Sequence, residues 1–189
     1  MKATEITKLT DEELVSKIVQ TNNTHLFAVL YDRYASVVYN KCYGFAKSRE
    51  EAEDLTHDVF IRLFVKLRTF KGRSKFSTWL YSFTYNFCVN YVQRNVHKKQ
   101  EKVTVVTDQV KEDSSIEEID DATLFALKSD QLAKALEMID PNEKMVLLMK
   151  YQDDMPIKEI AQLLELGESA VKMRLKRAKE KVVEICKGF

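Results

Sequence analysis

Glycine and proline are scarce in this chain, with four glycines and two prolines in 189 residues. Few backbone positions can therefore take the unusual angles that turns and irregular loops require. Apolar residues recur at helical spacing over most of the chain, and 45% of all residues are hydrophobic. Together these features predict an all-α fold with a globular core.

Residues 1–97 are predicted to form a first domain, a compact helical bundle. Thr10 to Glu13 (TDEE) and Ser48 to Glu51 (SREE) are both capping boxes, which mark the start of a helix. Apolar stripes at helical spacing follow each of them. The predicted helices span residues 10–20, 24–46, 48–68 and 76–96, with a loop at 69–75.

Residues 98–121 are predicted to be a flexible acidic linker. Between 101 and 121, eight acids oppose two lysines, a net charge of −6, and the apolar period is lost. A fully extended linker of this length spans roughly 80 Å. It is long enough to join two contacts on one DNA duplex, and the alternative is a solvated surface loop.

Residues 122–189 are predicted to form a second domain that contains a helix-turn-helix. Its predicted helices span 122–139, 143–151, 156–164 and 168–185. In the last of these, Val171, Leu175, Ala178 and Val182 share one face and are expected to pack on Ile157, Ile160, Ala161 and Leu164. The side chains expected to face outward are Ser169, Lys172, Met173, Lys176, Arg177 and Lys179.

The outward face of this last helix is the candidate for reading duplex DNA, with bases reached from its early turns and phosphates from the flanking cations. Seven bases and two acids between 170 and 189 give a net charge of +5. A solvated cationic helix end is the alternative interpretation. However, the cations begin near the helix start, where the helix dipole disfavours them.

Residues 59–100 hold nine Lys and Arg, no Asp or Glu, and ten of the nineteen aromatic residues of the chain. Cations hold a nucleic-acid backbone, and unpaired bases stack on aromatic faces, so the block predicts single-strand binding. The loop from Phe70 to Phe76, with Gly72, supplies the cations, while Asn86 and Asn90 share a helix face. The alternative is an aromatic core beneath a basic surface.

The helix predicted at 48–68 carries a second stripe, formed by Asp54, Asp58, Ile61 and Val65. A polar start followed by exposed apolar groups suits a protein partner. A helix buried on two sides would show the same spacing, and the sequence leaves both interpretations open.

Several classes of protein are disfavoured. Cys42, Cys88 and Cys186 are far apart and form no C-x-x-C pair, so neither a disulfide framework nor a structural zinc site is expected. No segment has the apolar length of a membrane span, and the N-terminus lacks a signal core. We expect a cytoplasmic protein without a cofactor, a metal or catalytic residues.

Three stretches of the chain resemble a known family. The runs AEDLTHDVFIRLF (52–64) and FKGRSKFSTWLYSFTYNFCVNY (70–91) resemble the second conserved region of extracytoplasmic-function (ECF) sigma factors, and MPIKEIAQLLELGESAVKMRLKRAKEKV (155–182) looks like their fourth region. The resemblance implies two DNA-binding domains, sigma-2-like and sigma-4-like, of a bacterial RNA polymerase subunit that recognises promoters and starts their melting.

The resemblance also implies partners and site residues. Polymerase contacts are expected at its clamp helices and flap, with the linker in the polymerase cleft and an anti-sigma factor as inhibitor. Docking on the clamp is implied for Asp54, His57, Asp58, Phe60 and Ile61. Capture of a flipped −10 base is implied for Phe70, Lys71, Gly72, Arg73, Ser74, Lys75, Phe76, Trp79, Asn86 and Asn90. Reading of the −35 element is implied for Ser169, Lys172, Met173, Lys176 and Arg177.

The sequence departs from the family pattern at three positions. His57 stands where Gln is usual, and Ala170 and Met173 stand where Thr and Ser are common. The −35 preference is thus open, since Met offers a base edge no hydrogen bond.

Two rival functions remain open at this stage. A duplex-binding helix-turn-helix regulator would need no polymerase and no single-strand site, so the 59–100 block argues against it. A nuclease would need a cluster of carboxylates or histidines, for which Asp54, His57 and Asp58 are the candidates.

Overall fold

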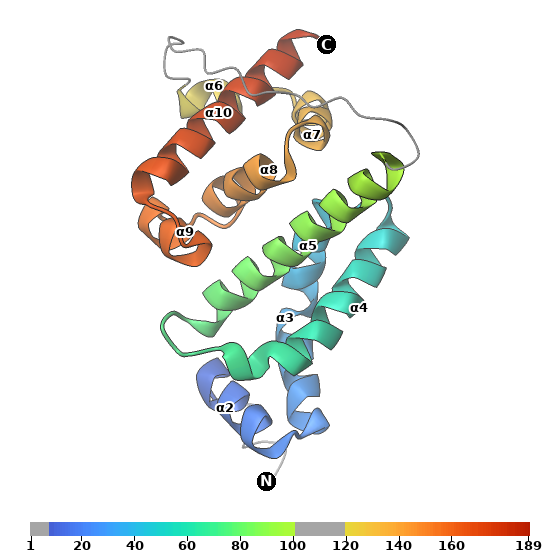
Figure 1. The fold of residues 1–189 in the computed structure, drawn as a ribbon, viewed down its shortest axis with the longest axis vertical. Helices are drawn as coiled ribbons and strands as arrows, with labels where there is room; N and C mark the ends of the chain where they lie inside the picture. The colour runs from blue at the N-terminus through green and yellow to red at the C-terminus, as the bar shows by residue number, and fades with distance from the viewer. Residues whose placement is uncertain (1–7, 101–119) are drawn as a thin grey trace. The chain divides into compact units, whose positions relative to one another are not determined.

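The computed structural model of the protein describes residues 8–100 and 120–189, and it divides into two compact units, Met1–Asn90 and Tyr91–Phe189. The described residues form helices and connecting turns without a strand, which confirms the predicted all-α fold (Figure 1). Residues 101–119, most of the linker predicted at 98–121, lie outside the described residues, so the domain boundaries stay a prediction. No helix among the described residues is long and apolar enough to cross a bilayer.

The first unit is built from consecutive helices joined by short turns. Thr10 caps the first helix as predicted: its hydroxyl accepts from the Glu13 N–H (3.2 Å) and its own N–H donates to the Glu13 carboxylate (2.9 Å). Ser48 likewise accepts from the N–H of Glu51 (3.1 Å). The helices are α2 (Asp11–Thr21), α3 (Thr24–Tyr43), α4 (Arg49–Lys66), the 3-10 turn η1 (Leu67–Thr69) and α5 (Phe76–Gln100), whose residues from Tyr91 on fall in the second unit.

The predicted apolar stripes form the core of this unit. Leu14, Val15 and Ile18 of α2 are buried, as are the inner residues of α4. Aromatic rings join α3 to α4, where Phe27 meets Phe60 and Phe64 edge-on at 6.3 and 5.0 Å between ring centroids. The expected helix ends are wrong by a turn in two places, because α3 stops at Tyr43 and α5 continues to Gln100.

Two cysteines that are far apart in the sequence meet in this core. The sulfurs of Cys42 on α3 and Cys88 on α5 lie 3.8 Å apart, a thiol–thiol contact and not a disulfide. The hydrogen bond from Cys88 lowers the pKa of the Cys42 thiol, against the opposing effect of burial. Next to Cys42, the buried Lys41 places its ammonium 4.1 Å from the ring centroid of Tyr81.

After Asp120, the second unit has two helices where the sequence predicted one. The helix is interrupted at residues 126–128, so the prediction of a single helix over 122–139 is wrong. The next helix starts at Pro141, capped by Asp140, whose carboxylate accepts from the Asn142 N–H (2.8 Å). The helices are α6 (Asp121–Phe125), α7 (Ser129–Met138), α8 (Pro141–Leu147), the π-helical turn η2 (Leu148–Gln152), α9 (Ile157–Leu164) and α10 (Glu168–Lys187).

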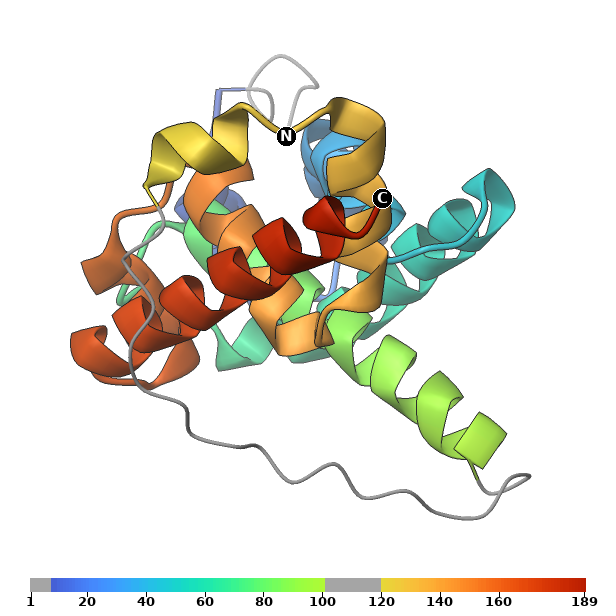
Figure 2. The ribbon, with the colours of Figure 1, turned by 90° about the horizontal axis from the view of Figure 1, so that it is seen from above.

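The pair α9–α10 is the predicted helix-turn-helix. Glu165 takes a left-handed conformation (φ +54°) that ends α9, and Gly167 immediately precedes α10. The predicted inner face of α10 is buried at Val171, Leu175, Ala178 and Val182. This helix packs on α7, α8 and α9. Figure 2 shows α10, in red, crossing the earlier helices of this unit.

Candidate nucleic-acid interface

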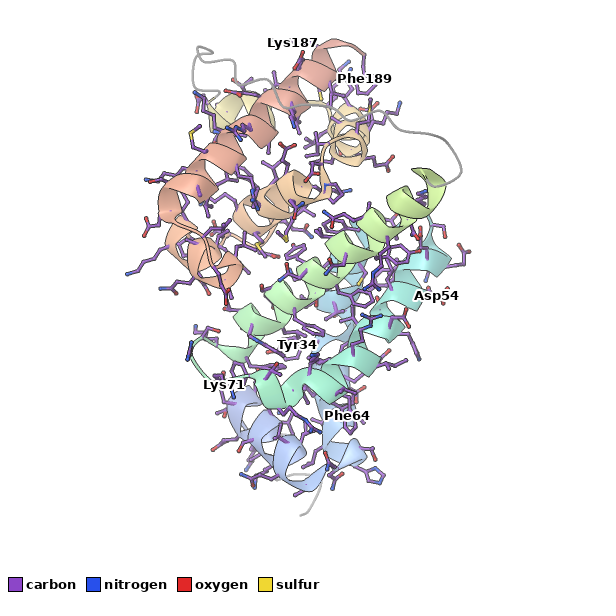
Figure 3. All side chains as sticks on the ribbon, viewed as in Figure 1. Tyr34, Asp54, Phe64, Lys71, Lys187 and Phe189 are labelled. Carbon is purple, nitrogen blue, oxygen red and sulfur yellow. The ribbon has the colours of Figure 1, made fainter. Side chains whose placement is uncertain are left out.

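The turn between η1 and α5 presents a row of cations to solvent. We call residues 70–75 the basic loop. Lys71, Arg73 and Lys75 are exposed, and Lys71 marks this loop in Figure 3. Gly72 has a left-handed backbone (φ +66°), which an L side chain rarely adopts, so glycine allows the loop to turn here. The loop therefore holds three ammonium or guanidinium groups on one short connection.

Beneath the basic loop lies a cluster of aromatic rings. Phe70 meets Phe76 edge-on at 5.5 Å and Trp79 at the same centroid distance. Trp79 stacks on Phe83 with centroids 5.5 Å apart and an angle of 19°. Phe70 and Trp79 are half-buried, whereas Phe76 is fully buried. Phe76 is thus placed to support the loop, while Phe70 and Trp79 stay partly exposed.

Helix α5 continues this surface beyond the aromatic cluster. Asn86 and Asn90 are both exposed and lie one turn apart, and the Asn86 amide donates to the Ser82 hydroxyl (3.4 Å). The cations of residues 59–100 lie in different environments. The guanidinium of Arg62 lies 4.9 Å from the ring centroid of Phe87, so this arginine also packs α4 against α5.

The second stripe of α4 is exposed. Asp54 and Asp58 are solvent-accessible, and the apolar Ile61 and Val65 are 61% and 59% exposed. Figure 3 shows Asp54 on the outer edge of α4. The alternative of a helix buried on two sides is therefore wrong for this element.

Two other docking candidates on α4 lie in different environments. His57 is exposed beside the stripe, whereas Phe60 is buried between Phe27 and Tyr31. Phe60 can thus shape the docking surface only from within. No three His, Cys, Asp or Glu side chains in residues 8–100 and 120–189 come together as a potential metal site.

On α10, the early outward residues are accessible. Ser169, Lys172 and Arg177 are exposed, and the Met173 side chain is 51% exposed. Lys176 is partly exposed and lies 3.9 Å from Glu180, one turn further along the helix. The start of α10 therefore offers a mixed surface of hydroxyl, thioether and cationic groups.

Lys179 was expected to face outward, and that expectation is wrong. Its side chain is 12% exposed, and its ammonium donates to the Asp121 carboxylate at 2.9 Å. The Tyr151 hydroxyl donates to the same carboxylate oxygen at 2.6 Å. Both hydrogen bonds lower the pKa of Asp121, and the one from Tyr151 has the larger effect. Lys179 thus fastens α6 to α10.

The predicted −35 residues line two hollows of the second unit. Lys172 and Lys176 share one hollow with Lys150 and Tyr151 of η2. Asp120 and Asp121 also line this hollow. Met173 and Arg177 line a second hollow with Arg174, Asp140 and Glu143, so both hollows combine cations with carboxylates. Sequence reasoning missed Lys150 and Arg174, because neither stands out in a local motif.

Sequence reasoning also missed two acidic residues of α2, of which Glu12 contacts the start of α5 and Asp11 contacts α3. The Glu12 carboxylate accepts from the Phe76 N–H at 3.0 Å, and Asp11 accepts from Arg33 (2.7 Å) and from the Tyr34 hydroxyl. Burial is the largest cause of the raised pKa of Tyr34, and the hydrogen bond to Asp11 is the second. The capping box located the α2 helix, but no local signal shows which residues it contacts.

Two family models match the chain in the order expected. The model "Sigma-70 region 2" matches residues 30–97, and "Sigma-70, region 4" matches residues 129–182. The basic loop and the exposed stripe of α4 lie in the first match, and the candidate −35 residues lie in the second.

Similar proteins agree with these matches. The "ECF RNA polymerase sigma factor SigW" of Bacillus subtilis is 26% identical over 87% of this chain and 90% of its own length. Among solved structures, "CnrH in complex with the cytosolic domain of CnrY" aligns with a TM-score of 0.60 at 18% identity, over 93% of this chain and 96% of the other. The sigma factor RpoE in complex with the anti-sigma factor NepR from Bartonella quintana aligns with a TM-score of 0.60 at 17% identity, over 85% and 96%.

Sigma factors are transcription initiation factors of RNA polymerase, and as a family they are not enzymes. Both family regions are present here in one chain, and the relatives align over nearly its whole length. The chain belongs to the sigma-70 family, in its extracytoplasmic-function group.

Proposed function

We propose that three surfaces of the chain divide the work of promoter recognition. The basic loop, with Phe70 and Trp79 beside it, captures an unpaired base of the −10 element. The start of α10 reads the −35 element as duplex, and the exposed stripe of α4 docks on the clamp helices of core polymerase. A regulator that binds only duplex DNA is not favoured by the family match.

One observation supports base capture most directly: the exposed cations share one short connection with Phe70, whose partly exposed ring contacts the partly exposed Trp79. Stacking on an aromatic ring contributes about 1–3 kcal/mol per base. Opening a base-pair step costs on average about 1.4 kcal/mol. One or two captured bases can therefore offset the opening of a few steps, which is enough to nucleate melting. Asn86 and Asn90 supply hydrogen-bonding groups on the same helix.

We assign different roles to the residues of the −35 set. Lys172, Lys176 and Arg177 carry the charge that contacts phosphates or base edges. Ser169 offers a hydroxyl, while the exposed thioether of Met173 suits an apolar contact such as a thymine methyl group. Lys150 lines the same hollow as Lys172 and is proposed as an additional phosphate contact.

The exposed stripe of α4 has the composition of a docking surface. Asp54 and Asp58 provide negative charge for cations of the partner, and Ile61 and Val65 provide apolar area. We also propose that an anti-sigma factor binds this chain, since one similar solved structure is a sigma factor in complex with an anti-sigma factor. We propose further that the chain is not an enzyme and that it acts in the cytoplasm.

The test is co-purification with core RNA polymerase, followed by run-off transcription from a pool of genomic fragments. We expect the chain to bind core polymerase and to start transcripts from a subset of fragments. Asp58→Arg reverses a charge in the middle of the exposed stripe and should abolish co-purification. Asp32→Arg, an exposed charge reversal on α3, is the control. Retained association of Asp58→Arg would refute the docking role.

A further inference from the structure

Helix α5, which carries Asn86 and Asn90, begins without a cap of its own. Its first residue is Phe76, and the Lys75 carbonyl accepts from the Trp79 N–H (3.2 Å), which places Lys75 at the cap position. A cap residue normally supplies a side-chain oxygen to the unpaired N–H groups of the first turn. Lysine has no acceptor atom. The acceptor for the first turn must therefore come from elsewhere.

Glu12 supplies that acceptor. Its carboxylate accepts from the Phe76 N–H at 3.0 Å, across 64 residues of sequence. A negative charge at the start of a helix is also favourable for the helix dipole. Glu12 lies in the first turn of α2, which Leu14, Val15 and Ile18 anchor in the core. The end of the basic loop is thus tied to a fixed helix.

Asp11, the neighbour of Glu12, reaches Phe76 by a second route. It accepts hydrogen bonds from Arg33 (2.7 Å) and from the Tyr34 hydroxyl. The ring of Tyr34 packs edge-on against Phe76, with centroids 5.6 Å apart and an angle of 76°. One turn of α2 therefore holds both the backbone and the ring of the residue that follows the basic loop.

We propose that Glu12 is a positioning residue for base capture, which holds the end of the basic loop so that its cations and rings face an unpaired base. The inference rests on the proposed function of the loop. It also adds a role for α2, which precedes the residues matched by the region 2 family model.

Positioning and electrostatics predict opposite effects of removing this carboxylate. Glu12 adds a negative charge beside a loop that binds a polyanion, so its charge alone weakens binding. If Glu12 acted only through charge, Glu12→Ala would bind single-stranded DNA more tightly. If Glu12 positions the loop, Glu12→Ala binds less tightly, whereas Glu12→Gln keeps an oxygen acceptor and binds as well as the natural chain.

The experiment uses the full chain with core polymerase and a forked template made from a genomic fragment that the natural chain transcribes. Affinity is measured for the forked template and for the same fragment as sealed duplex. We expect Glu12→Ala to lose about fivefold in affinity for the fork, the effect of one lost cap, and little for the duplex. Glu12→Gln should stay within about twofold of the natural chain.

Glu13→Ala is the matched control, because it removes the capping box of α2 on the same turn without removing the contact to Phe76. The inference is overturned if Glu12→Ala keeps its affinity for the fork, if Glu12→Gln is as defective as Glu12→Ala, or if Glu13→Ala loses the fork equally. Failure of the proposed function has a different signature, since the natural chain itself would then show no preference for the fork.

Discussion

The basic loop and the α10 face both present cations, but they hold them differently. Along residues 59–100 the sequence contains no carboxylate, and the loop cations are exposed. On α10, Lys176, Lys179 and Lys181 lie within ion-pair distance of Glu180, Asp121 and Glu143. Three cations of α10 thus take part in ion pairs within the fold, whereas the loop rests on aromatic packing and its cations stay exposed.

This comparison assigns a different physical basis to each surface. Ion pairs at a surface contribute little to stability and weaken with salt. Buried aromatic contacts depend little on salt, so the loop keeps its shape where the α10 pairs are screened. The predictions below test this difference, beginning with the largest expected effect.

Phe76→Ala tests whether the loop depends on its buried ring. Removing a fully buried phenylalanine should lower the free energy of unfolding of the first unit by about 3–5 kcal/mol. Chemical denaturation measures the change. Phe189→Ala, at an exposed ring, should stay within about 0.5 kcal/mol of the natural chain. A small loss for Phe76→Ala would mean that the ring is not the support of the loop.

Arg73→Ala tests whether the loop acts on opened DNA. We expect strand opening, measured as permanganate reactivity of −10 thymines, to fall about tenfold, the effect of about 1.4 kcal/mol. Binding to sealed duplex should change little. Lys47→Ala removes one exposed positive charge outside the loop and should leave opening intact. Equal effects of the two variants would reduce the role of the loop to its charge alone.

Lys176→Ala and Arg177→Ala test the duplex-reading face. Each lost phosphate contact should lower the slope of log affinity against log salt by about one. The slope is measured on sealed duplex that contains the −35 element. Lys187→Ala, on the last turn of the same helix, should leave it unchanged. An unaltered slope in both test variants would show that these residues do not contact the DNA.

Asp121→Asn tests the contact that fastens α6 to α10. Hydrogen bonds from Tyr151 and Lys179 lower the pKa of Asp121 in the folded chain. These contacts therefore stabilise the fold above the unfolded pKa of about 3.9, and this stability is lost as pH falls through the folded pKa. We expect Asp121→Asn to lower the free energy of unfolding by about 0.2–1 kcal/mol at neutral pH.

The same variant should flatten the dependence of stability on acid pH, as measured by denaturation at several pH values. Asp154→Asn is its control, because Asp154 is exposed and has a left-handed backbone that asparagine also adopts. If the two variants show the same pH dependence, the Asp121 contact has no role in acid stability.

Helix positions and their inner faces were predictable from local patterns. The period of 3.6 residues placed Val171, Leu175 and Ala178 on the buried face of α10, and the capping box located the start of α2. Both signals lie within a few residues of the structure they predict. The break between α6 and α7 was missed, because the apolar period continues across it.

The site was less predictable, because its geometry depends on contacts distant in sequence. Sequence reasoning could not separate the buried Phe76 from the accessible Phe70, since both flank the same loop. The contact of Glu12 with Phe76 and the thiol contact of Cys42 with Cys88 join segments 64 and 46 residues apart. Likewise, Lys179 has the helical position of an outward residue, yet Asp121 of another helix covers it.

The central claim is that the first unit captures unpaired bases while the second binds intact duplex. The most direct measurement compares the affinity of the chain with core polymerase for a forked template and for the same sequence as sealed duplex, at low and high salt. We predict tighter binding to the fork, with a preference that persists as salt rises. Equal affinity for the two templates at every salt concentration would contradict the account.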